Sequence, residues 1–132
     1  MILVDTSVLV AWLDASHEHH RICTESLEHW SGRDELAVSA VAYAELAAGA
    51  RTRQAVDDWL SGFRRIEIDF DAAWRAGVAV RQFRPGKGEG DPVLPDFLIR
   101  GQAAILACRH LTNDRRRRKV WPEVDWVFPE DR

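Results

Sequence analysis

Cysteine, lysine and long apolar runs are scarce in this sequence. Only Cys23 and Cys108 occur among its 132 residues. They lack a metal-binding spacing, so we expect reduced, buried thiols rather than a disulfide or a zinc site. No apolar run approaches the roughly 20 residues that span a bilayer. The chain also reaches Asp5 without a basic region or a cleavage signal, which predicts no membrane association and a cytoplasmic location.

The shortage of lysine argues against a phosphate-binding loop. Lys87 and Lys119 are the only lysines, and no Gly-rich loop ends in Lys-Ser or Lys-Thr. No nucleophile pairs with an obvious base either. The net charge of −3 excludes a strongly basic nucleic-acid coat, although a local basic rim remains compatible with it.

What remains is the composition of one globular domain. Hydrophobic residues make up 46% of the chain, which argues against disorder, and 132 residues suffice for one buried core. No internal repeat and no long linker divides the sequence. We therefore predict a single domain that spans residues 1–132.

Strand and helix patterns alternate along this domain. Strands are predicted at 2–4, 36–38, 66–68, 109–114 and 124–128, and helices at 8–13, 22–30, 40–50, 56–63, 71–83 and 95–107. Thr6, Ser7 and Ser39 are expected to cap helices. The segment 85–92, rich in Gly and Pro, is expected to be a surface loop. This order predicts an α/β fold, a three-layer αβα domain with a mainly parallel, about five-stranded sheet.

Two aspartates are expected to follow neighbouring strands. The apolar run 2–4 is typical of a buried parallel strand, and Asp5 comes directly after it. Asp114 ends the fourth predicted strand in the same way. If these strands flank a chain reversal, their carboxyl ends share one crevice, which is where open α/β sheets place their sites. The alternative for Asp114 is a loop aspartate that starts the next turn.

Two acids on predicted helices would join them. Glu45 has small helical neighbours such as Ala44 and Ala48, so we expect it on or beside the packing face, where it would need a cation to stay ionised. A solvated glutamate on an Ala-rich helix is the alternative. Asp96 follows Pro95 at a helix start, where its charge also suits the helix dipole. The joint placement of all four acids points to a site more strongly than any one of them.

Four gathered carboxylates repel one another unless cations compensate their charge. Two divalent ions, with about four positive charges, would balance them, and oxygen ligands without supporting His or Cys select Mg²⁺ or Mn²⁺. Such ions support hydrolysis of a phosphodiester by metal-activated water. This chemistry needs neither a lysine nor a protein nucleophile.

Four short motifs in series resemble those of a known family. They are Asp5-Thr6-Ser7 after a strand, Tyr43-Ala44-Glu45-Leu46 in a helix, Leu94-Pro95-Asp96-Phe97-Leu98-Ile99 at a helix start and Leu111-Thr112-Asn113-Asp114 at a strand end. Together they resemble the acidic motifs of PIN-domain ribonucleases, and most closely those of VapC-like toxins of bacterial type II toxin–antitoxin pairs. The resemblance covers nearly the whole chain.

The resemblance implies a Mg²⁺-dependent endoribonuclease, with Mn²⁺ as an alternative metal. It implies a homodimer that acts on structured or messenger RNA and is inhibited by a cognate antitoxin. The family's catalytic and metal-binding acids correspond to Asp5, Glu45, Asp96 and Asp114. Asp5 and Asp96 are the firmest metal ligands, and Asn113 is an alternative to Asp114.

Neighbouring polar residues are expected to support these acids. Thr6 or Ser7, together with Thr112, would orient the carboxylates or bound water. Arg100 departs from the small residue of many relatives, and it would either crowd its helix face or approach RNA.

Two charged groups have open interpretations. The run Arg115–Lys119 directly follows the fourth acid, so it would either hold RNA phosphates beside the metals or form a solvated turn. His17, His19 and His20 have a spacing suggestive of metal binding, but an exposed helix start is the preferred interpretation.

Two other functions remain open. A non-catalytic interaction module would use the acidic crevice to accept an arginine from a partner antitoxin. A phosphatase would also bind Mg²⁺, but a phosphoaspartate enzyme needs an Asp-x-Asp sequence, and Ser7 stands at the second position here.

Overall fold

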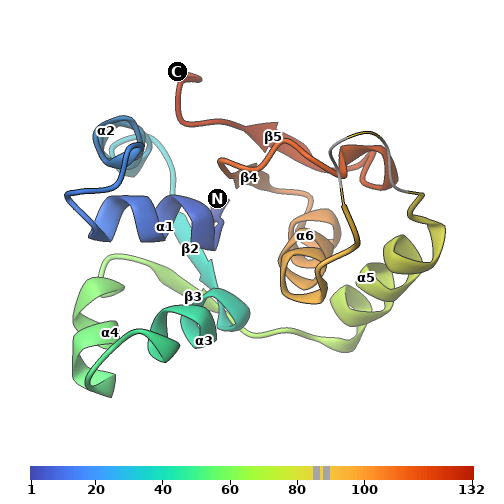
Figure 1. Ribbon diagram of the computed structural model, residues 1–132, viewed down its shortest axis with the longest axis horizontal. Coiled ribbons are helices and arrows are strands. Elements are labelled where there is room, and N and C mark those ends of the chain that lie inside the picture. Colours follow the sequence, from blue (N-terminus) through green and yellow to red (C-terminus); the bar gives the residue numbers. More distant parts are fainter. Residues whose placement is uncertain (85–86, 88–89) are drawn as a thin grey trace.

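The computed structural model describes residues 1–84, 87 and 90–132, and this part of the chain contains one five-stranded sheet (Figure 1). Its strands are β1 (Ile2–Val4), β2 (Leu36–Ser39), β3 (Arg64–Ile66), β4 (Arg109–Leu111) and β5 (Asp125–Val127). They lie in the order β3-β2-β1-β4-β5, and every neighbouring pair is parallel. The predicted parallel sheet is confirmed.

Helices cover both faces of this sheet. They are α1 (Thr6–Leu13), α2 (His20–Ser31), α3 (Ala40–Ala48), α4 (Arg53–Trp59), α5 (Phe70–Gln82) and α6 (Leu94–Leu106), with the short 3₁₀ helix η1 (Arg118–Val120) before β5. In Figure 1, α1 and α2 lie to the left of the sheet, and α5 and α6 lie to its right. The predicted three-layer arrangement is therefore confirmed. Among the described residues, none of these helices has the length and apolar character needed to traverse a membrane.

The chain reverses its direction across the sheet at β1. From β1 it steps to β2 and β3, and it then crosses to β4 on the other side of β1. Because parallel crossovers are right-handed, the helices before and after this reversal cover opposite faces. Val4 pairs with Leu111, and the backbone N–H of Asp5 donates to the Leu111 carbonyl at 2.8 Å. The carboxyl ends of β1 and β4 thus meet at the switch point of the sheet.

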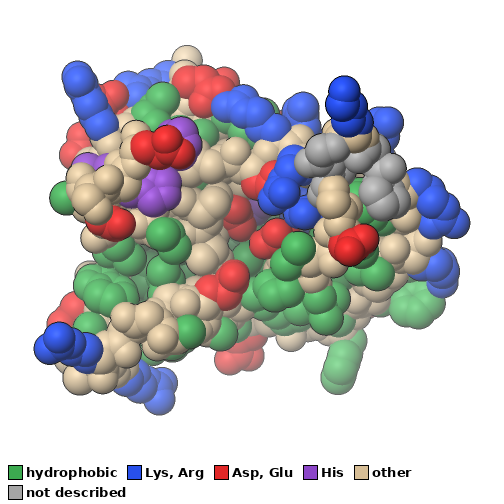
Figure 2. Space-filling model, viewed as in Figure 1, with side chains coloured by type: hydrophobic (Ala, Val, Ile, Leu, Met, Phe, Trp, Pro, Cys, Tyr) green, Lys and Arg blue, Asp and Glu red, His purple; other side chains and the backbone are tan. Residues whose placement is uncertain are grey.

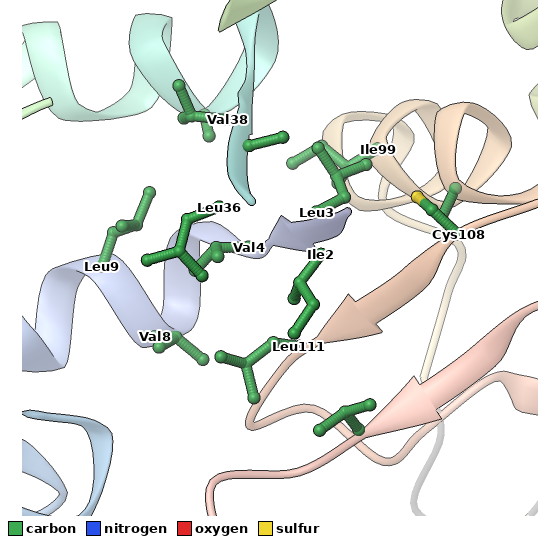
Figure 3. Close-up of a cluster of buried hydrophobic side chains, with 14 of the residues drawn as sticks. Ile2, Leu3, Val4, Val8, Leu9, Leu36, Val38, Ile99, Cys108 and Leu111 are labelled. Carbon is green, nitrogen blue, oxygen red and sulfur yellow. The ribbon is translucent and has the colours of Figure 1, made fainter. Parts of the chain in front are cut away.

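The hydrophobic core is built around β1. Ile2, Leu3 and Val4 are fully buried, and Figure 3 shows side chains from α1, β2 and α6 gathered around them. Burial on both faces of the sheet explains why this strand is a continuous apolar run. Cys23 and Cys108 are free and buried, as predicted.

Two strands differ from their predicted ranges by more than one residue. The third strand lies at 64–66 rather than 66–68, because its neighbour β2 ends at Ser39, which pairs with Ile66. The alternation of Ile66, Glu67 and Ile68 therefore predicted a strand that starts two residues too late. The fourth strand ends at Leu111 rather than at 114. The predicted loop at 85–92 includes residues 85–86 and 88–89, which lie outside the described residues.

The first helix begins earlier than expected. It starts at Thr6, and Asp5 is the N-cap residue. The prediction that Thr6 and Ser7 cap this helix was wrong, because both hydroxyls bond carboxylates instead. Ser39 does cap α3, since its hydroxyl accepts a hydrogen bond from the Val41 N–H at 3.0 Å.

Helices α5 and α6 approach each other closely at Gly101. A Cβ atom on Gly101 would lie 2.5 Å from the carbonyl oxygen of Ala72 and 3.3 Å from the amide nitrogen of Ala76. Both are backbone atoms, so a side-chain rotation cannot relieve the overlap. Since α6 also carries Asp96 in its first turn, this crossing helps to fix the position of that carboxylate.

We predict that Gly101→Ala lowers the free energy of unfolding by about 1–3 kcal/mol, because the added methyl group forces the two helices apart. Gly77→Ala on α5 is the matched control. A Cβ there meets nothing within 4 Å, so this helix-favouring change should raise stability by about 0.5–1 kcal/mol. Urea denaturation followed by circular dichroism measures both. Equal stabilities for the two variants would contradict the close crossing.

Candidate metal centre

A cavity of about 490 Å³ opens at the switch point of the sheet. The four predicted acids, Asp5, Glu45, Asp96 and Asp114, all line it, although they are far apart in the sequence. Figure 2 shows acidic side chains in a hollow near the middle of this face, with Lys and Arg side chains beside them. The fold therefore gathers negative charge where β1 and β4 end.

Asp5 is fixed at the end of β1 by two hydroxyl groups. It is only 7% exposed. Ser7 Oγ and Thr112 Oγ1 donate hydrogen bonds to Asp5 Oδ2 at 2.7 and 2.8 Å. Within the described residues, no hydrogen bond reaches the other carboxylate oxygen, Oδ1. The hydroxyls thus orient Asp5 as expected and leave one oxygen available for a cation.

The same hydroxyls tie the loop after β4 to the end of β1. Thr112 Oγ1 accepts a hydrogen bond from the Asp114 N–H at 3.0 Å, and Ser7 Oγ accepts one from the Asn113 N–H at 3.1 Å. The Asn113 side-chain amide donates to the Ser7 carbonyl at 3.3 Å and contacts Cys23 Sγ at 3.3 Å. Asn113 is therefore engaged in holding the loop.

Glu45 enters the cavity from α3 and is exposed. Glu45 was expected on or beside the packing face; it lies beside that face, next to the buried Leu46, and the alternative of a solvated glutamate describes its exposure. Leu46 lies on the buried side of α3, whereas Ala44 and Ala48 are exposed. Alanine is compatible with solvent as well as with a core, so the alanines around Glu45 did not identify a packing face. The Thr6 hydroxyl donates to Glu45 Oε1 at 2.8 Å, which connects this carboxylate to the start of α1.

Asp96 lies in the first turn of α6, and its pKa is perturbed. The N-cap of this helix is Val93, and no side-chain hydrogen bond caps it, so a capping role does not account for Asp96. Burial, followed by the negative charge of Asp5, raises the pKa of Asp96 above its ordinary value. The charge of Arg100 opposes this shift only in part. Burial and the neighbouring carboxylate of Asp5 therefore disfavour the ionised form of Asp96.

Asp114 lies in the loop after β4 and is surrounded by arginines. Arg116 donates to Asp114 Oδ1 from its backbone N–H at 2.9 Å and from Nε at 3.0 Å. Arg100 Nη2 lies 3.3 Å from Asp114 Oδ2. Burial alone would raise the pKa of Asp114, but the hydrogen bonds from Arg116 and the charge of Arg100 hold it below its ordinary value. The pKa values of Asp96 and Asp114 are thus shifted in opposite directions.

The basic run Arg115–Lys119 turns partly inward. Arg117 is only 3% exposed and has a φ of 64°. Its Nη1 lies 3.6 Å from Asp96 Oδ2 and 3.6 Å from Asp114 Oδ2. Neither interpretation of the run holds for Arg117, which is neither solvated nor accessible to RNA phosphates. Arg116, in contrast, lines the cavity and is exposed.

Sequence reasoning missed that two histidines border the acids. His17, Glu18 and His19 line the same cavity, and the rings of His17 and His19 lie 5.6 Å apart. His20 Nδ1 instead contacts the Ala11 carbonyl at 2.9 Å. Helix α2 begins at His20, two residues before the predicted start at 22, so His17 and His19 lie in the turn that precedes the helix. The turn between α1 and α2 comes back to the end of β1 in the folded chain, and this places His17 and His19 beside the acids. The sequence alone does not show this.

The donor set fits a hard divalent cation. Within the described residues, no three His, Cys, Asp or Glu side chains already form a closed metal cage. Mg²⁺ keeps several waters and commonly takes only one or two carboxylates, so it does not require such a cage. Burial, followed by the charge of Asp5, raises the pKa of Asp96, and both acids line the cavity. Asp5 and Asp96 would hold the ion, and Glu45 would reach its water shell.

The structure is thus an open α/β domain with a carboxylate-lined cavity at the switch point of its parallel sheet. Residues 2–121 match the PIN domain, and the chain belongs to the PIN domain family. No curated protein sequence matches the chain.

Solved structures share this fold over nearly the whole chain. A chain of a toxin–antitoxin complex from Klebsiella pneumoniae is 23% identical with a TM-score of 0.75, and the match covers 100% of both chains. FitAcB from Neisseria gonorrhoeae is 20% identical with a TM-score of 0.73, over 98% of each chain. VapBC2 from Rickettsia felis, bound to a DNA fragment from its promoter, is 18% identical with a TM-score of 0.70, over 97% of this chain and 98% of that one. At these identities the likeness establishes the fold.

We predict that Asp96→Asn stabilises the metal-free protein. The folded state binds the Asp96 proton more tightly than the unfolded chain does, so wild-type stability falls as the pH rises from the usual value of 3.8 to the raised pKa. At pH 7 in EDTA the melting temperature of Asp96→Asn should exceed that of the wild type by a few degrees. The difference should shrink as the pH approaches 4.

Asp71→Asn is the control, because Asp71 is an exposed acid in the first turn of α5. It should leave the melting temperature unchanged within about a degree. A lower melting temperature for Asp96→Asn at pH 7 would show that the negative charge of Asp96 is already compensated.

Proposed function

We propose that this PIN-domain chain is a Mg²⁺-dependent endoribonuclease, with Mn²⁺ as an alternative metal. The observation that carries this proposal is the convergence of Asp5, Glu45 and Asp96 on one cavity. When bound there, the metal would lower the pKa of a water for attack on an RNA phosphodiester and offset the charge of the leaving oxygen. The chain's own side chains then have to bind the ion, orient the water and position the RNA.

The acids divide these tasks in our proposal. Asp5, oriented by Ser7 and Thr112, offers Oδ1 as the first metal ligand. Asp96 would be the second ligand, and a bound cation would favour its ionised form by opposing the raised pKa. Glu45 is exposed and is held by the start of α1, so it would accept a hydrogen bond from the attacking water.

Arg116 and Asp114 also line the cavity. The Arg116 side chain is 51% exposed and bonded to Asp114, so its guanidinium would contact an RNA phosphate while Asp114 orients it. Asp114, the fourth acid of the family motif, would thus act as a positioning residue for Arg116. Base specificity would depend on groove shape and RNA structure.

We also infer that the protein is the VapC-like toxin of a toxin–antitoxin pair. The similar solved structures are toxin–antitoxin complexes, which supports this role. The toxin would cut RNA in the cytoplasm as a homodimer until a cognate antitoxin binds it. Phe70 and Trp74 on α5 are 93% and 70% exposed, and such apolar exposure is typical of a surface that contacts another protein.

Purified protein should cut total RNA in the presence of Mg²⁺ or Mn²⁺ and stop when EDTA is added. Asp5→Asn should lower the cleavage rate by at least about a hundredfold, because it removes a metal ligand without changing side-chain volume. Asp71→Asn should cut at the wild-type rate. Gel electrophoresis of end-labelled RNA measures both the rate and the sites.

A non-catalytic interaction module remains the second candidate function. Its support is the same acidic cavity, which would accept an arginine from a partner. This candidate predicts tight antitoxin binding without metal-stimulated cleavage. Cleavage that survives both EDTA and Asp5→Asn would instead overturn the metal mechanism.

Expression of the wild-type chain in a bacterial host should arrest growth, and Asp5→Asn should restore it, because arrest depends on RNA cleavage in our proposal. If a small open reading frame adjoins the gene, its co-expression should relieve the arrest in the same way. Colony counts after induction measure this effect. Equal growth arrest by wild type and Asp5→Asn at matched protein levels would show that the toxicity does not depend on the acidic cavity.

A further inference from the structure

Arg100 is a buried cation beside the proposed metal centre. It lies inside α6 and is only 2% exposed. Its Nη1 donates to the Arg116 carbonyl at 3.0 Å, and its guanidinium lies 5.0 Å from the centre of the Trp126 ring. Its charged partner is Asp114, with Nη2 and Oδ2 3.3 Å apart. Because a buried charge is costly unless it is paired, the fold holds Arg100 and Asp114 together.

Both oxygens of Asp114 are already engaged by arginines. Oδ1 accepts from the backbone N–H and Nε of Arg116. Oδ2 lies 3.3 Å from Arg100 Nη2, 3.3 Å from Arg116 Nη2 and 3.6 Å from Arg117 Nη1. Asp5 differs, since its hydrogen bonds from described residues reach Oδ2 alone. The carboxylate best placed to accept a metal is therefore that of Asp5, not that of Asp114.

The charge balance also differs from the one that predicted two metal ions. Three guanidinium groups, those of Arg100, Arg116 and Arg117, contact the acids of the cavity. They offset most of the charge of four carboxylates, and all three contact Asp114. This leaves about one net negative charge, and Asp5 and Glu45 are the two acids that these three arginines do not contact. One divalent ion suffices to balance this charge.

We propose that Arg100 is a positioning residue that keeps Asp114 out of metal coordination, so that the centre takes a single divalent ion at Asp5 and Asp96. This inference rests on the metal-dependent function proposed above. It concerns metal stoichiometry and ligand choice, so it is testable without RNA and without a measurement of cleavage.

Titration with Mn²⁺, followed by the electron paramagnetic resonance signal of the free ion, tests the ligand assignment. Wild-type protein should bind one Mn²⁺ per chain. Asp114→Asn should bind it with less than about a twofold change in Kd, whereas Asp96→Asn, a matched amide substitution, should weaken binding by at least about tenfold. Loss of Mn²⁺ affinity in Asp114→Asn as large as that in Asp96→Asn would overturn the inference.

Arg100 variants test the positioning role by a readout that a merely structural role would not change. Arg100→Gln removes the buried charge and one of the three arginine contacts to Asp114 Oδ2, so a second, weaker Mn²⁺ should bind per chain. Arg100→Lys keeps the charge and should bind only one. A single Mn²⁺ in a folded Arg100→Gln protein, as judged by circular dichroism, would contradict the proposal.

A further test uses the wild-type protein and needs no variant. Arginine side-chain NMR signals of Arg100 should show slow hydrogen exchange before and after Mg²⁺ is added, because the pair with Asp114 persists. Mg²⁺-induced loss of this protection would mean that the ion takes Asp114 and would refute the inference. Absence of any Mn²⁺ binding by the wild type would overturn the metal-dependent function as well, whereas one bound ion with altered ligands would overturn this inference alone.

Discussion

Repulsion among the carboxylates at the ends of β1 and β4 is the constraint on which the rest of this structure depends. Asp5 and Asp96 line one cavity with Glu45 and Asp114, and the fold compensates their charge unevenly. Arginines surround Asp114 and hold its pKa low, whereas burial and the charge of Asp5 raise the pKa of Asp96. Opposite shifts in neighbouring acids are typical of sites in which each acid has a separate task.

The sheet and its helices determine where these carboxylates lie. Burial of residues 2–4 in the core fixes the position of β1 in the sheet. The parallel pairing of β1 with β4 then brings Asp5 beside Thr112. On the other face, the close crossing at Gly101 fixes α6 against α5, and α6 carries Asp96. Packing far from the cavity therefore determines how close the acids come to one another.

The sequence predicts those features that leave a local pattern. The apolar run of β1, the cap at Ser39 and the alternation of strands and helices all do so, and the fold class and the meeting of the acids followed from them. The register of β3 depends on where β2 ends, which is not local. The burial of Arg117 depends on a positive φ and on Asp96, which lies on another element, so a basic run in the sequence gives no sign of it.

A fixed cation and an exchangeable one have different consequences for such a cavity. Arg100 neutralises Asp114 at every metal concentration, because a guanidinium does not lose its proton in a protein. A divalent ion would neutralise Asp5 and Asp96 only when it is bound, and a proton on Asp96 would compete with it. The arginine side of the cavity therefore carries a permanent positive charge. On the other side, Arg117 Nη1 lies 3.6 Å from Asp96 Oδ2, and hydroxyl groups rather than arginines bond Asp5. The binding energy of a metal would be available for chemistry there.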